Sequence, residues 1–372
     1  MKFTCLQENF TKGLGIVSKA ISARAPLPIL SNILIVAQDG RLKLTAFNGD
    51  TSISTFVGAS VDEEGAITVP AKLIGEFVSN LSPSNIEGEL KDSVLHLTTE
   101  KTKSKFNGVD ASSYPELPEV KEGSKTVELE PRIFSDAILS VAFSAATDES
   151  RPILTGILLR YEEGNLTAVS ADGFRLSEKV VPLESKIKKF EAVIPAKTLV
   201  EVARVFGSSE EPIQMVLSQE ENLVVFESGE VTISTRIING DFPDYKKLIP
   251  EETKHKAEFS AESLLEAVRL TNVFAKGKDI LSPINLGLDS EGLIRLTSAS
   301  QESGETKNEI EATIEGGDLE TVFNSKYLLD FLNNIKAERL VLLSNGGLTP
   351  GVLRPANEDD YTHLIMPIRN QS

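Results

Sequence analysis

The tetrapeptide Val69-Pro70-Ala71-Lys72 returns 125 positions later as Ile194-Pro195-Ala196-Lys197. A second pair of matching stretches, Pro28-Ile29-Leu30 and Pro152-Ile153-Leu154, lies 124 positions apart. Ser282-Pro283-Ile284 carries the same pattern into the last third of the chain. Because agreeing offsets mark an internal duplication, the sequence predicts three similar repeats of about 125 residues.

Each repeat divides again into two halves. A short strand followed by an amphipathic helix is expected at six points, which begin near Phe3, Ala66, Val127, Glu191, Ala257 and Thr321. Apolar residues three or four apart predict helices over 8–24, 71–81, 131–144, 196–206, 261–278 and 325–337. Alternating β-branched runs, such as 157–161 and 166–170, follow the helices.

The pattern therefore predicts one strand, one helix and three strands in each half-repeat. Two half-repeats make one α+β domain. Acidic or polar stretches near 118–125 and 250–256 separate the repeats. The predicted domains are 1–122, 123–251 and 252–372.

Composition excludes several classes of protein. The net charge of −17 argues against wholesale wrapping of nucleic acid and against binding to an anionic membrane. One cysteine, Cys5, and three scattered histidines leave little material for a disulfide, a zinc site or a catalytic triad. The opening residues lack a signal peptide's apolar core, and no run of about 18 apolar residues occurs. We expect a cytoplasmic protein without metal or cofactor.

Positive charge gathers in the predicted helices, which hold twelve basic and seven acidic residues. The basic residues are Lys12, Lys19, Arg24, Lys72, Arg132, Lys197, Arg204, Arg269, Lys276, Lys278, Lys326 and Lys336. Exposed helix faces favour Lys and Arg for ordinary reasons, which explains any single residue in this set. Segregation over six equivalent helices instead favours phosphate binding without sequence reading.

Geometry constrains the assembly if these helices line a channel around duplex DNA. About twelve helices, each about 10–12 Å wide, are then needed, and one chain supplies six. A closed dimer or another closed oligomer satisfies this requirement. Lys101, Lys103 and Lys105 alternate along one predicted strand, while Glu302, Glu305, Glu309 and Glu311 crowd the corresponding part of the third repeat. Opposite charges suggest head-to-tail pairing, although edge protection alone explains the same residues.

Six motifs in order carry a family resemblance. They are Met1-Lys2-Phe3-Thr4, Leu27-Pro28-Ile29-Leu30-Ser31-Asn32, Arg151-Pro152-Ile153-Leu154-Thr155-Gly156, Ala171-Asp172-Gly173-Phe174-Arg175-Leu176, Gly240-Asp241-Phe242-Pro243-Asp244-Tyr245 and Met366-Pro367-Ile368-Arg369. Over its whole length the chain resembles the bacterial DNA polymerase β sliding clamps. The resemblance implies a homodimeric ring with helices inside and sheets outside, which encircles duplex DNA without sequence specificity. The implied partners are a second copy, the replicative DNA polymerase, the clamp loader and DNA repair proteins.

The resemblance also implies a groove between the second and third domains that binds short partner peptides. Its residues would be Arg151, Leu154, Ala171, Gly173, Phe174, Arg175, Leu176, Pro243, Lys247, Leu248, Leu364, Met366, Pro367, Ile368 and Arg369. Apolar side chains suit a peptide's hydrophobic anchors, and Arg151, Arg175 and Lys247 suit its acidic groups. Leu154 and Leu176 can equally be core residues. Phe174 and Lys247 stand where the family commonly has His and Arg, and Asn370-Gln371-Ser372 extends beyond the usual end.

Two further surfaces are expected. The DNA-facing residues are Arg24, Lys72, Lys12, Lys197, Arg204, Lys276 and Lys336. The resemblance supports Arg24 and Lys72, and the charge count supports the others. The dimer interface is expected at Lys103, Lys105, Phe106, Val273, Phe274, Glu302 and Glu305.

Two other functions compete with this interpretation. Asp172, Asp241 and Asp244 near Arg175 offer carboxylates for an enzyme, but they lie in predicted turns, where Asp has local backbone reasons to occur. Gly13-Leu14-Gly15 lacks the third glycine of a dinucleotide-binding motif. We therefore expect no enzyme activity, no catalytic residue and no small-molecule substrate. A repeat scaffold that binds proteins but never DNA stays open as the alternative.

Overall fold

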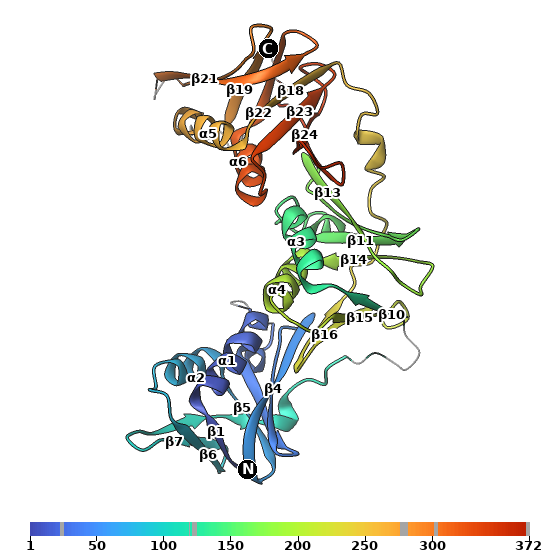
Figure 1. Cartoon of the computed structure of the whole chain (residues 1–372). Coiled ribbons are helices and arrows are strands. Elements are labelled where there is room, and N and C mark those ends of the chain that lie inside the picture. Colours follow the sequence, from blue (N-terminus) through green and yellow to red (C-terminus); the bar gives the residue numbers. More distant parts are fainter. Residues whose placement is uncertain (23–25, 119, 121–124, 276–281, 301–303, 370–372) are drawn as a thin grey trace. The chain divides into compact units, whose positions relative to one another are not determined.

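The computed structural model describes residues 1–22, 26–118, 120, 125–275, 282–300 and 304–369. Within these residues, six α-helices alternate with groups of strands (Figure 1). The helices are α1 (Gln7–Val17), α2 (Ala71–Ser79), α3 (Pro131–Ala142), α4 (Ala196–Phe206), α5 (Ala261–Ala275) and α6 (Ser325–Asn334). All six predicted helices are confirmed.

Several helices end before the predicted residue. The largest difference is at α1, which ends at Val17 and is followed by a 3-10 turn over Ser18–Ala20. Ile21 continues the apolar spacing that led the prediction onward, but its backbone is extended, with φ −72° and ψ 122°. The predicted helix end at 24 is therefore wrong, whereas the predicted end at 278 falls in 276–281, outside the described residues, and stays a prediction.

One strand precedes each helix and three follow it, as predicted, except that the short β9 adds a fourth strand after α2. The strands of the first domain are β1 (Lys2–Leu6), β2 (Asn32–Gln38), β3 (Arg41–Phe47), β4 (Thr51–Glu63), β5 (Gly65–Pro70), β6 (Asn85–Lys91), β7 (Val94–Thr98), β8 (Lys103–Asn107) and the short β9 (Val109–Asp110). Those of the second are β10 (Lys125–Leu129), β11 (Gly156–Glu162), β12 (Asn165–Ala171), β13 (Arg175–Pro182), β14 (Lys189–Pro195), β15 (Ile213–Ser218), β16 (Leu223–Ser228) and β17 (Val231–Arg236). Those of the third are β18 (His255–Ser260), β19 (Pro283–Asp289), β20 (Leu293–Ser300), β21 (Gly304–Glu315), β22 (Leu319–Asn324), β23 (Arg339–Ser344), β24 (Gly351–Pro355) and β25 (Tyr361–Ile365).

The first strand of every half-repeat pairs within the sheet of its sibling. Thus β1 pairs with β6, and β5 pairs with β2. The same exchange joins β10 to β15, β14 to β11, β18 to β23, and β22 to β19. Each half-repeat therefore lends a strand to the other, so neither half has a complete sheet alone.

Contacts divide the chain into two compact units, each of which is described by itself. The first comprises 1–135, 185–187 and 201–237, and the second comprises 136–184, 188–200 and 238–372. In the first unit β4 pairs antiparallel with β17, from Thr51 opposite Thr235 to Thr55 opposite Val231. We call this pairing the first seam.

A second seam lies within the other compact unit. There β13 pairs antiparallel with β25, from Arg175 opposite Ile365 to Lys179 opposite Tyr361. Each seam joins strands from consecutive sequence repeats into one continuous sheet. Both seams bury backbone hydrogen-bonding groups that would otherwise form open sheet edges.

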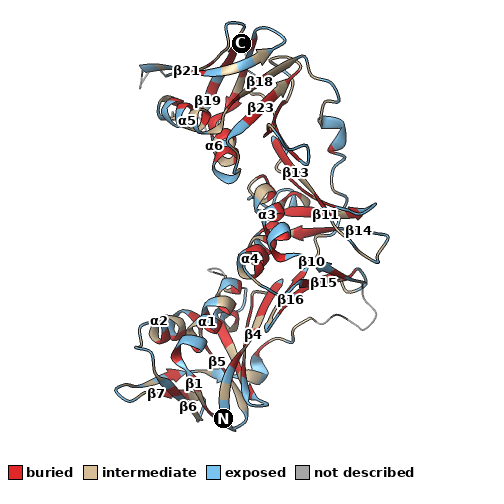
Figure 2. Cartoon of the chain, in the orientation of Figure 1, coloured by how far each residue is buried: buried red, intermediate tan, exposed pale blue. Residues whose placement is uncertain are grey.

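The helices bury one face each against the sheets (Figure 2). In α1, Phe10, Leu14 and Val17 are at most 1% exposed, which confirms the predicted apolar stripe. A Cβ atom on Gly13 would lie 2.5 Å from Val57 Cγ2, so this close approach of helix to sheet requires glycine. No helix in the described part of the chain is long and apolar enough to cross a membrane.

Candidate binding surfaces

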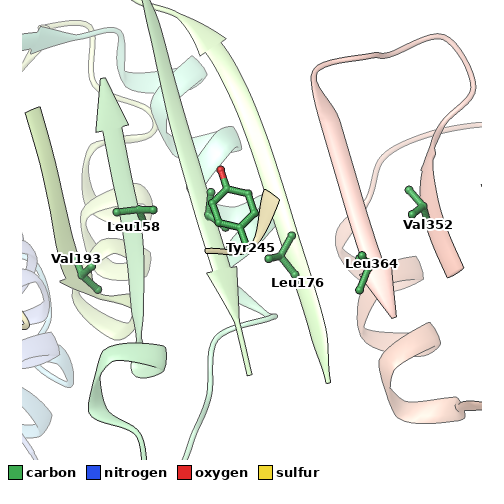
Figure 3. Close-up of a cluster of buried hydrophobic side chains, with 7 residues drawn as sticks. Leu158, Leu176, Val193, Tyr245, Val352 and Leu364 are labelled. Atoms are coloured by element: carbon green, nitrogen blue, oxygen red, sulfur yellow. The ribbon is translucent and has the colours of Figure 1, made fainter. Parts of the chain in front are cut away.

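A buried apolar cluster lies behind the second seam. Its members come from β11 to β14, from β24 and β25, and from the segment after β17: Leu158, Val169, Leu176, Val193, Tyr245, Val352 and Leu364 (Figure 3). Partly buried apolar residues pack against it: Ile153, Ala171, Ile238, Phe242, Ile249, Leu343 and Met366. These residues give the cluster an accessible apolar side, which we call the apolar surface.

The predicted groove residues divide between core and surface. Leu154, Leu176 and Leu364 are 4%, 2% and 1% exposed, so they support the site from within. Ala171 and Met366 belong to the apolar surface. The predicted groove did not include the other five residues of this surface, which are Ile153, Ile238, Phe242, Ile249 and Leu343. Ile153 and Phe242 lie within motifs that the sequence had already drawn attention to, Pro152-Ile153-Leu154 and Asp241-Phe242-Pro243-Asp244. An apolar residue inside a turn motif was the signal that could have identified them as surface contacts.

A tight loop at 172–174 borders this surface. Asp172 Oδ1 accepts hydrogen bonds from the backbone N–H groups of Phe174, at 2.8 Å, and Arg175, at 3.0 Å. Gly173 has a φ of +94°, a conformation that disfavours other residues. The Phe174 carbonyl accepts a hydrogen bond of 2.8 Å from Met366 N–H, which ties the loop to the apolar surface. Phe174 itself is 62% exposed.

Arg175 does not have the role predicted for it. Its side chain is 7% exposed, and its guanidinium group forms ion pairs with Asp172 at 3.0 Å and Asp330 at 2.6 Å. The guanidinium carbon also lies 4.6 Å from the centre of the Tyr327 ring. Because internal carboxylates already pair with this cation, it is not free to receive an acidic group of a peptide. Asp172 is a local partner, but Tyr327 and Asp330 belong to α6, 152 and 155 residues away in sequence, and no local pattern predicts them.

The other predicted groove residues are more accessible. Arg151 is exposed, and its Nη1 would lie 3.7 Å from a Cβ atom placed on Gly173. Lys247 is 82% exposed and pairs with Asp244 at 2.7 Å, and this hydrogen bond raises the pKa of Lys247. Leu248 is 49% exposed. Pro243 and Arg369 are exposed, whereas Pro367 and Ile368 are partly buried. The tail 370–372 lies outside the described residues.

A buried histidine links the two strands of the second seam. His363 is fully buried, with its Nδ1 at 2.8 Å from Ser177 Oγ, which in turn lies 2.7 Å from Ser144 Oγ. Its ring stacks on Phe331 at 4.8 Å. Burial, reinforced by the positive charge of Arg175, lowers the pKa of His363 to about 3, so the ring is neutral.

The observed helix ends remove the predicted excess of positive charge. Within their actual bounds the six helices hold seven basic and seven acidic residues. The basic ones are Lys12, Lys72, Arg132, Lys197, Arg204, Arg269 and Lys326, and the acidic ones are Glu8, Glu76, Asp136, Glu201, Glu262, Glu266 and Asp330. Of the cations that made up the predicted surplus, Lys19 and Lys336 follow α1 and α6, whereas Arg24, Lys276 and Lys278 lie outside the described residues. The helices as described therefore show no excess of positive charge.

A narrower pattern of charge survives. Lys72, Arg132, Lys197 and Lys326 each occupy the second residue of a helix, in α2, α3, α4 and α6, and each is exposed. A cation in the first turn opposes the helix dipole by ~0.3–1 kcal/mol, so its recurrence calls for a reason other than helix stability. Within the described part of the chain, no ion pair engages these four side chains.

The other predicted DNA-facing residues are placed less uniformly. Lys12 is exposed on α1. Arg204 pairs with Glu201 at 3.1 Å. Lys336 lies beyond the end of α6, is 94% exposed and pairs with Asp136 at 3.9 Å. Arg24 and Lys276 lie outside the described residues.

Two of the unpaired strand edges carry many charged residues. In the described part of the chain β8 pairs only with β7, and residues 304–311 of β21 pair only with β20. The strands β10, β14 and β22 also pair with one strand each. Lys103 and Lys105 are exposed on β8, while Glu305, Glu309 and Glu311 are exposed on β21. Glu309 is already held by Lys307 and Arg295, whose hydrogen bonds lower its pKa. Glu302 lies outside the described residues.

Helices beside both edges expose apolar side chains. Leu73 on α2 is 55% exposed, and Leu270 and Val273 on α5 are 51% and 62% exposed. Phe274 is partly buried. Phe106, predicted to supply apolar contact, is 3% exposed and packs edge-on against Phe77 at 5.2 Å. Phe106 therefore attaches β8 to α2 within its own domain.

A pocket of about 540 Å³ opens between α5 and β21. Its lining includes Glu266 and Leu270 from α5 and Asn308, Ile310 and Glu311 from β21. It therefore presents acidic and apolar groups beside the unpaired edge. The sequence analysis did not predict it.

Two of the three carboxylates considered for an enzyme have local structural partners. Asp172 organises its own loop and pairs with Arg175, while Asp244 pairs with Lys247. Among the described residues, no three His, Cys, Asp or Glu side chains lie close enough together to hold a metal ion.

Comparison with known proteins covers the whole chain. Three models of the DNA polymerase III beta subunit match: its N-terminal domain at 1–118, its central domain at 128–244 and its C-terminal domain at 246–369. A beta sliding clamp of Halalkalibacterium halodurans is 31% identical over 99% of this chain and 100% of its own length.

Solved structures show the same similarity. The DNA polymerase sliding clamp of Bacillus subtilis is 27% identical with a TM-score of 0.93, covering 100% of this chain and 99% of that one. The beta chain of DNA polymerase III from Streptococcus pneumoniae is 28% identical, also with a TM-score of 0.93, covering 99% of this chain and 100% of that one.

Proposed function

Since the chain belongs to the family of bacterial beta sliding clamps, the DNA polymerase III beta subunits, we propose that two copies close head to tail into a ring around duplex DNA. The chain has the three-domain fold of this family and is a DNA sliding clamp. The proposal concerns how it closes, which residues face DNA and where partners bind.

The unpaired edges of β8 and β21 carry this proposal. Each seam joins an edge strand of one domain to an edge strand of the next, and the same two strand positions stay open at β8 and β21. If β8 of one copy pairs antiparallel with β21 of another, two such pairings complete a closed dimer. Lys103 and Lys105 would then share a face with Glu305 and Glu311, and Leu73 would approach Leu270 and Val273.

The second-position cations give the ring its proposed DNA face. Lys72, Arg132, Lys197 and Lys326 recur at equivalent positions of four helices, despite the unfavourable helix dipole. Contacts with phosphate fix a protein on a duplex without reading its sequence. We include Lys12, Arg204, Arg24, Lys276 and Lys336 in this face as flanking charges.

The apolar surface beside the second seam is the proposed peptide site. Met366, Ala171 and Phe242 offer apolar contact, and Phe174 and Leu248 expose further apolar area nearby in sequence. A partner peptide with apolar anchors gains from burying this area. We propose that the replicative polymerase, the clamp loader and DNA repair proteins use this site in turn.

The remaining features follow from the same proposal. We assign domains 1–122, 123–251 and 252–372, close to the limits of the three family models. The chain acts in the cytoplasm, by binding and without an enzymatic reaction of its own. Its proposed partners are a second copy of the chain, duplex DNA and other proteins, and they include neither a membrane nor a small-molecule substrate.

Retention on circular DNA tests the ring. We expect the chain, loaded on a nicked plasmid by a clamp loader, to stay bound at salt that removes ordinary phosphate binders, and to leave once the plasmid is cut. Lys72→Ala with Lys197→Ala should weaken loading without changing the mass of the dimer. Release at equal rates from circular and linear DNA would favour the scaffold alternative.

A selected peptide tests the apolar surface. Random heptapeptides displayed on phage and selected on this chain should bind through apolar residues. Met366→Ala should abolish binding of the best peptide while the dimer persists. Unchanged affinity in Met366→Ala would contradict the site.

A further inference from the structure

The side chain of Asp172 holds the loop 172–174 through both of its carboxylate oxygens. Asp172 uses Oδ1 to bind the backbone N–H groups of Phe174 and Arg175, and uses Oδ2 to receive the Arg175 Nε–H at 3.0 Å. Its carboxylate is thereby fixed at both oxygens. The position of Phe174 follows from the position of Asp172, which in turn depends on Arg175.

Arg175 is in turn held by α6. Its Nη1 donates to Asp330 Oδ2 at 2.6 Å, and Tyr327, one turn earlier on α6, lies under the guanidinium group. A guanidinium group that is 7% exposed depends on such partners, because a buried charge without them is costly. Asp330 is the partner that anchors this cation to a different domain from the loop.

Asp330 is removed from the proposed peptide contacts. It lies on α6 rather than in the apolar surface, and its side chain is 32% exposed. Water can therefore partly solvate the Asp330 carboxylate, so Asp330 depends less on this ion pair than the buried Arg175 guanidinium group does. The principal consequence of removing it is a less constrained Arg175.

Resting on the peptide site proposed above, we propose that Asp330 is a positioning residue for partner binding: through Arg175 it fixes the loop that presents Phe174. Phe174 is 62% exposed, and its backbone is held by hydrogen bonds to Asp172 and Met366. Its phenyl ring is therefore preorganised for contact with an apolar side chain of a peptide. Preorganisation raises affinity because less freedom is lost on binding. Helix α6 thus governs peptide affinity without touching the peptide.

The test measures binding of the fluorescein-labelled heptapeptide selected on the wild-type chain. We expect Asp330→Ala to weaken binding about tenfold, and Asp330→Glu to restore part of the affinity because it retains the carboxylate. Asp136→Asn is the matched control, since Asp136 is another helical carboxylate, in α3, paired with an exposed lysine. This control should bind as the wild type does.

A double-mutant cycle separates positioning from general stability. If Asp330 acts through the loop, Asp330→Ala should have little further effect in a Phe174→Ala background. Equal losses in both backgrounds, or unchanged affinity in Asp330→Ala, would overturn the inference while leaving the peptide site intact. If the wild type selects no peptide, or Met366→Ala binds the selected peptide normally, the proposed site itself fails.

Discussion

The two seams have the same strand geometry but very different side chains. The first seam pairs Thr51-Ser52-Ile53-Ser54-Thr55 with Val231-Thr232-Ile233-Ser234-Thr235, so Ile faces Ile, a hydroxyl faces a hydroxyl at three positions, and Thr55 faces Val231. Ser52 Oγ lies 2.7 Å from Ser234 Oγ, and Thr51 Oγ1 lies 2.9 Å from Thr235 Oγ1. No ionisable side chain occurs in these ten positions.

The second seam instead contains Arg175, Glu178, Lys179 and His363, and it lies against the apolar surface. A seam that only joins two domains needs matched neutral side chains. In our proposal the second seam also positions the loop that binds partners, and it does so with buried charge, which costs more and fixes geometry more narrowly. We therefore propose that one seam only joins domains, while the other joins domains and supports partner binding.

Removing the buried cation should have the largest effect. Arg175→Met leaves Asp172 and Asp330 without their shared partner, and we expect β25 to open more easily by ~2–3 kcal/mol. The effect is below that of a fully buried pair because these carboxylates are 15% and 32% exposed. Hydrogen exchange of peptides from β25 measures it, with β17 as the internal control. Equal change at both strands would remove the distinction between the seams.

Acid should weaken only the second seam. The pKa of His363 is 6.5 in the unfolded chain and about 3 in the folded chain. Above pH 6.5 the ring is neutral in both states, so protonation of His363 takes nothing from the stability of the folded state. Below that pH the unfolded state takes up a proton, and stability falls by about 1.4 kcal/mol per pH unit towards pH 3. From pH 6.5 to pH 5 the loss is about 2 kcal/mol.

Hydrogen exchange at pH 7 and pH 5, corrected for intrinsic rates, measures this loss at β25. His363→Asn, which keeps a polar atom near Ser177, should reduce the dependence. An equal acid response of β17 and β25, or an undiminished response in His363→Asn, would assign the effect to other groups.

Charge reversal should weaken the proposed pairing between copies. Lys103→Glu with Lys105→Glu places like charges opposite Glu305 and Glu311, and we expect dimer affinity to fall about tenfold at low salt, or about 1.4 kcal/mol. Sedimentation equilibrium measures the affinity. Lys43→Glu, on β3 rather than on an unpaired edge, is the control. An unaltered dimer would remove β8 from the interface.

The smallest effect is expected at the first seam. Ser234→Ala leaves the buried Ser52 hydroxyl without this partner and should cost ~1 kcal/mol of opening free energy at β17. Adding Ser52→Ala removes both hydroxyls, so the double variant should lose less than the two single variants together. Urea-dependent hydrogen exchange of β17 measures both. Strict additivity would mean that the two hydroxyls do not interact.

Sequence periodicity predicted the repeating architecture because helix and strand patterns are local. The strand starts near Phe3, Ala66, Val127, Glu191, Ala257 and Thr321 are all confirmed within β1, β5, β10, β14, β18 and β22. The exchange of first strands between half-repeats was not predictable, because either sibling sheet could satisfy the same alternating pattern.

The candidate site was predictable only in part. The motif around 171–176 pointed to the loop that we propose binds partners, but the pairing of Arg175 with Asp330 spans 155 residues and depends on tertiary structure. Helix ends were the weakest part of the prediction, and the predicted charge count depended on them. Lys19 lies in the 3-10 turn after α1, and Lys336 lies beyond the end of α6.

Hydrogen exchange at β8 and at residues 304–311 of β21 tests the central claim most directly. The claim is that a third seam, like the two within the chain, forms between copies. We predict that both segments are protected at concentrations where the mass is twice 40.4 kDa, and that both lose protection together on dilution to the monomer. Rapid exchange of both segments in the dimer would contradict the account.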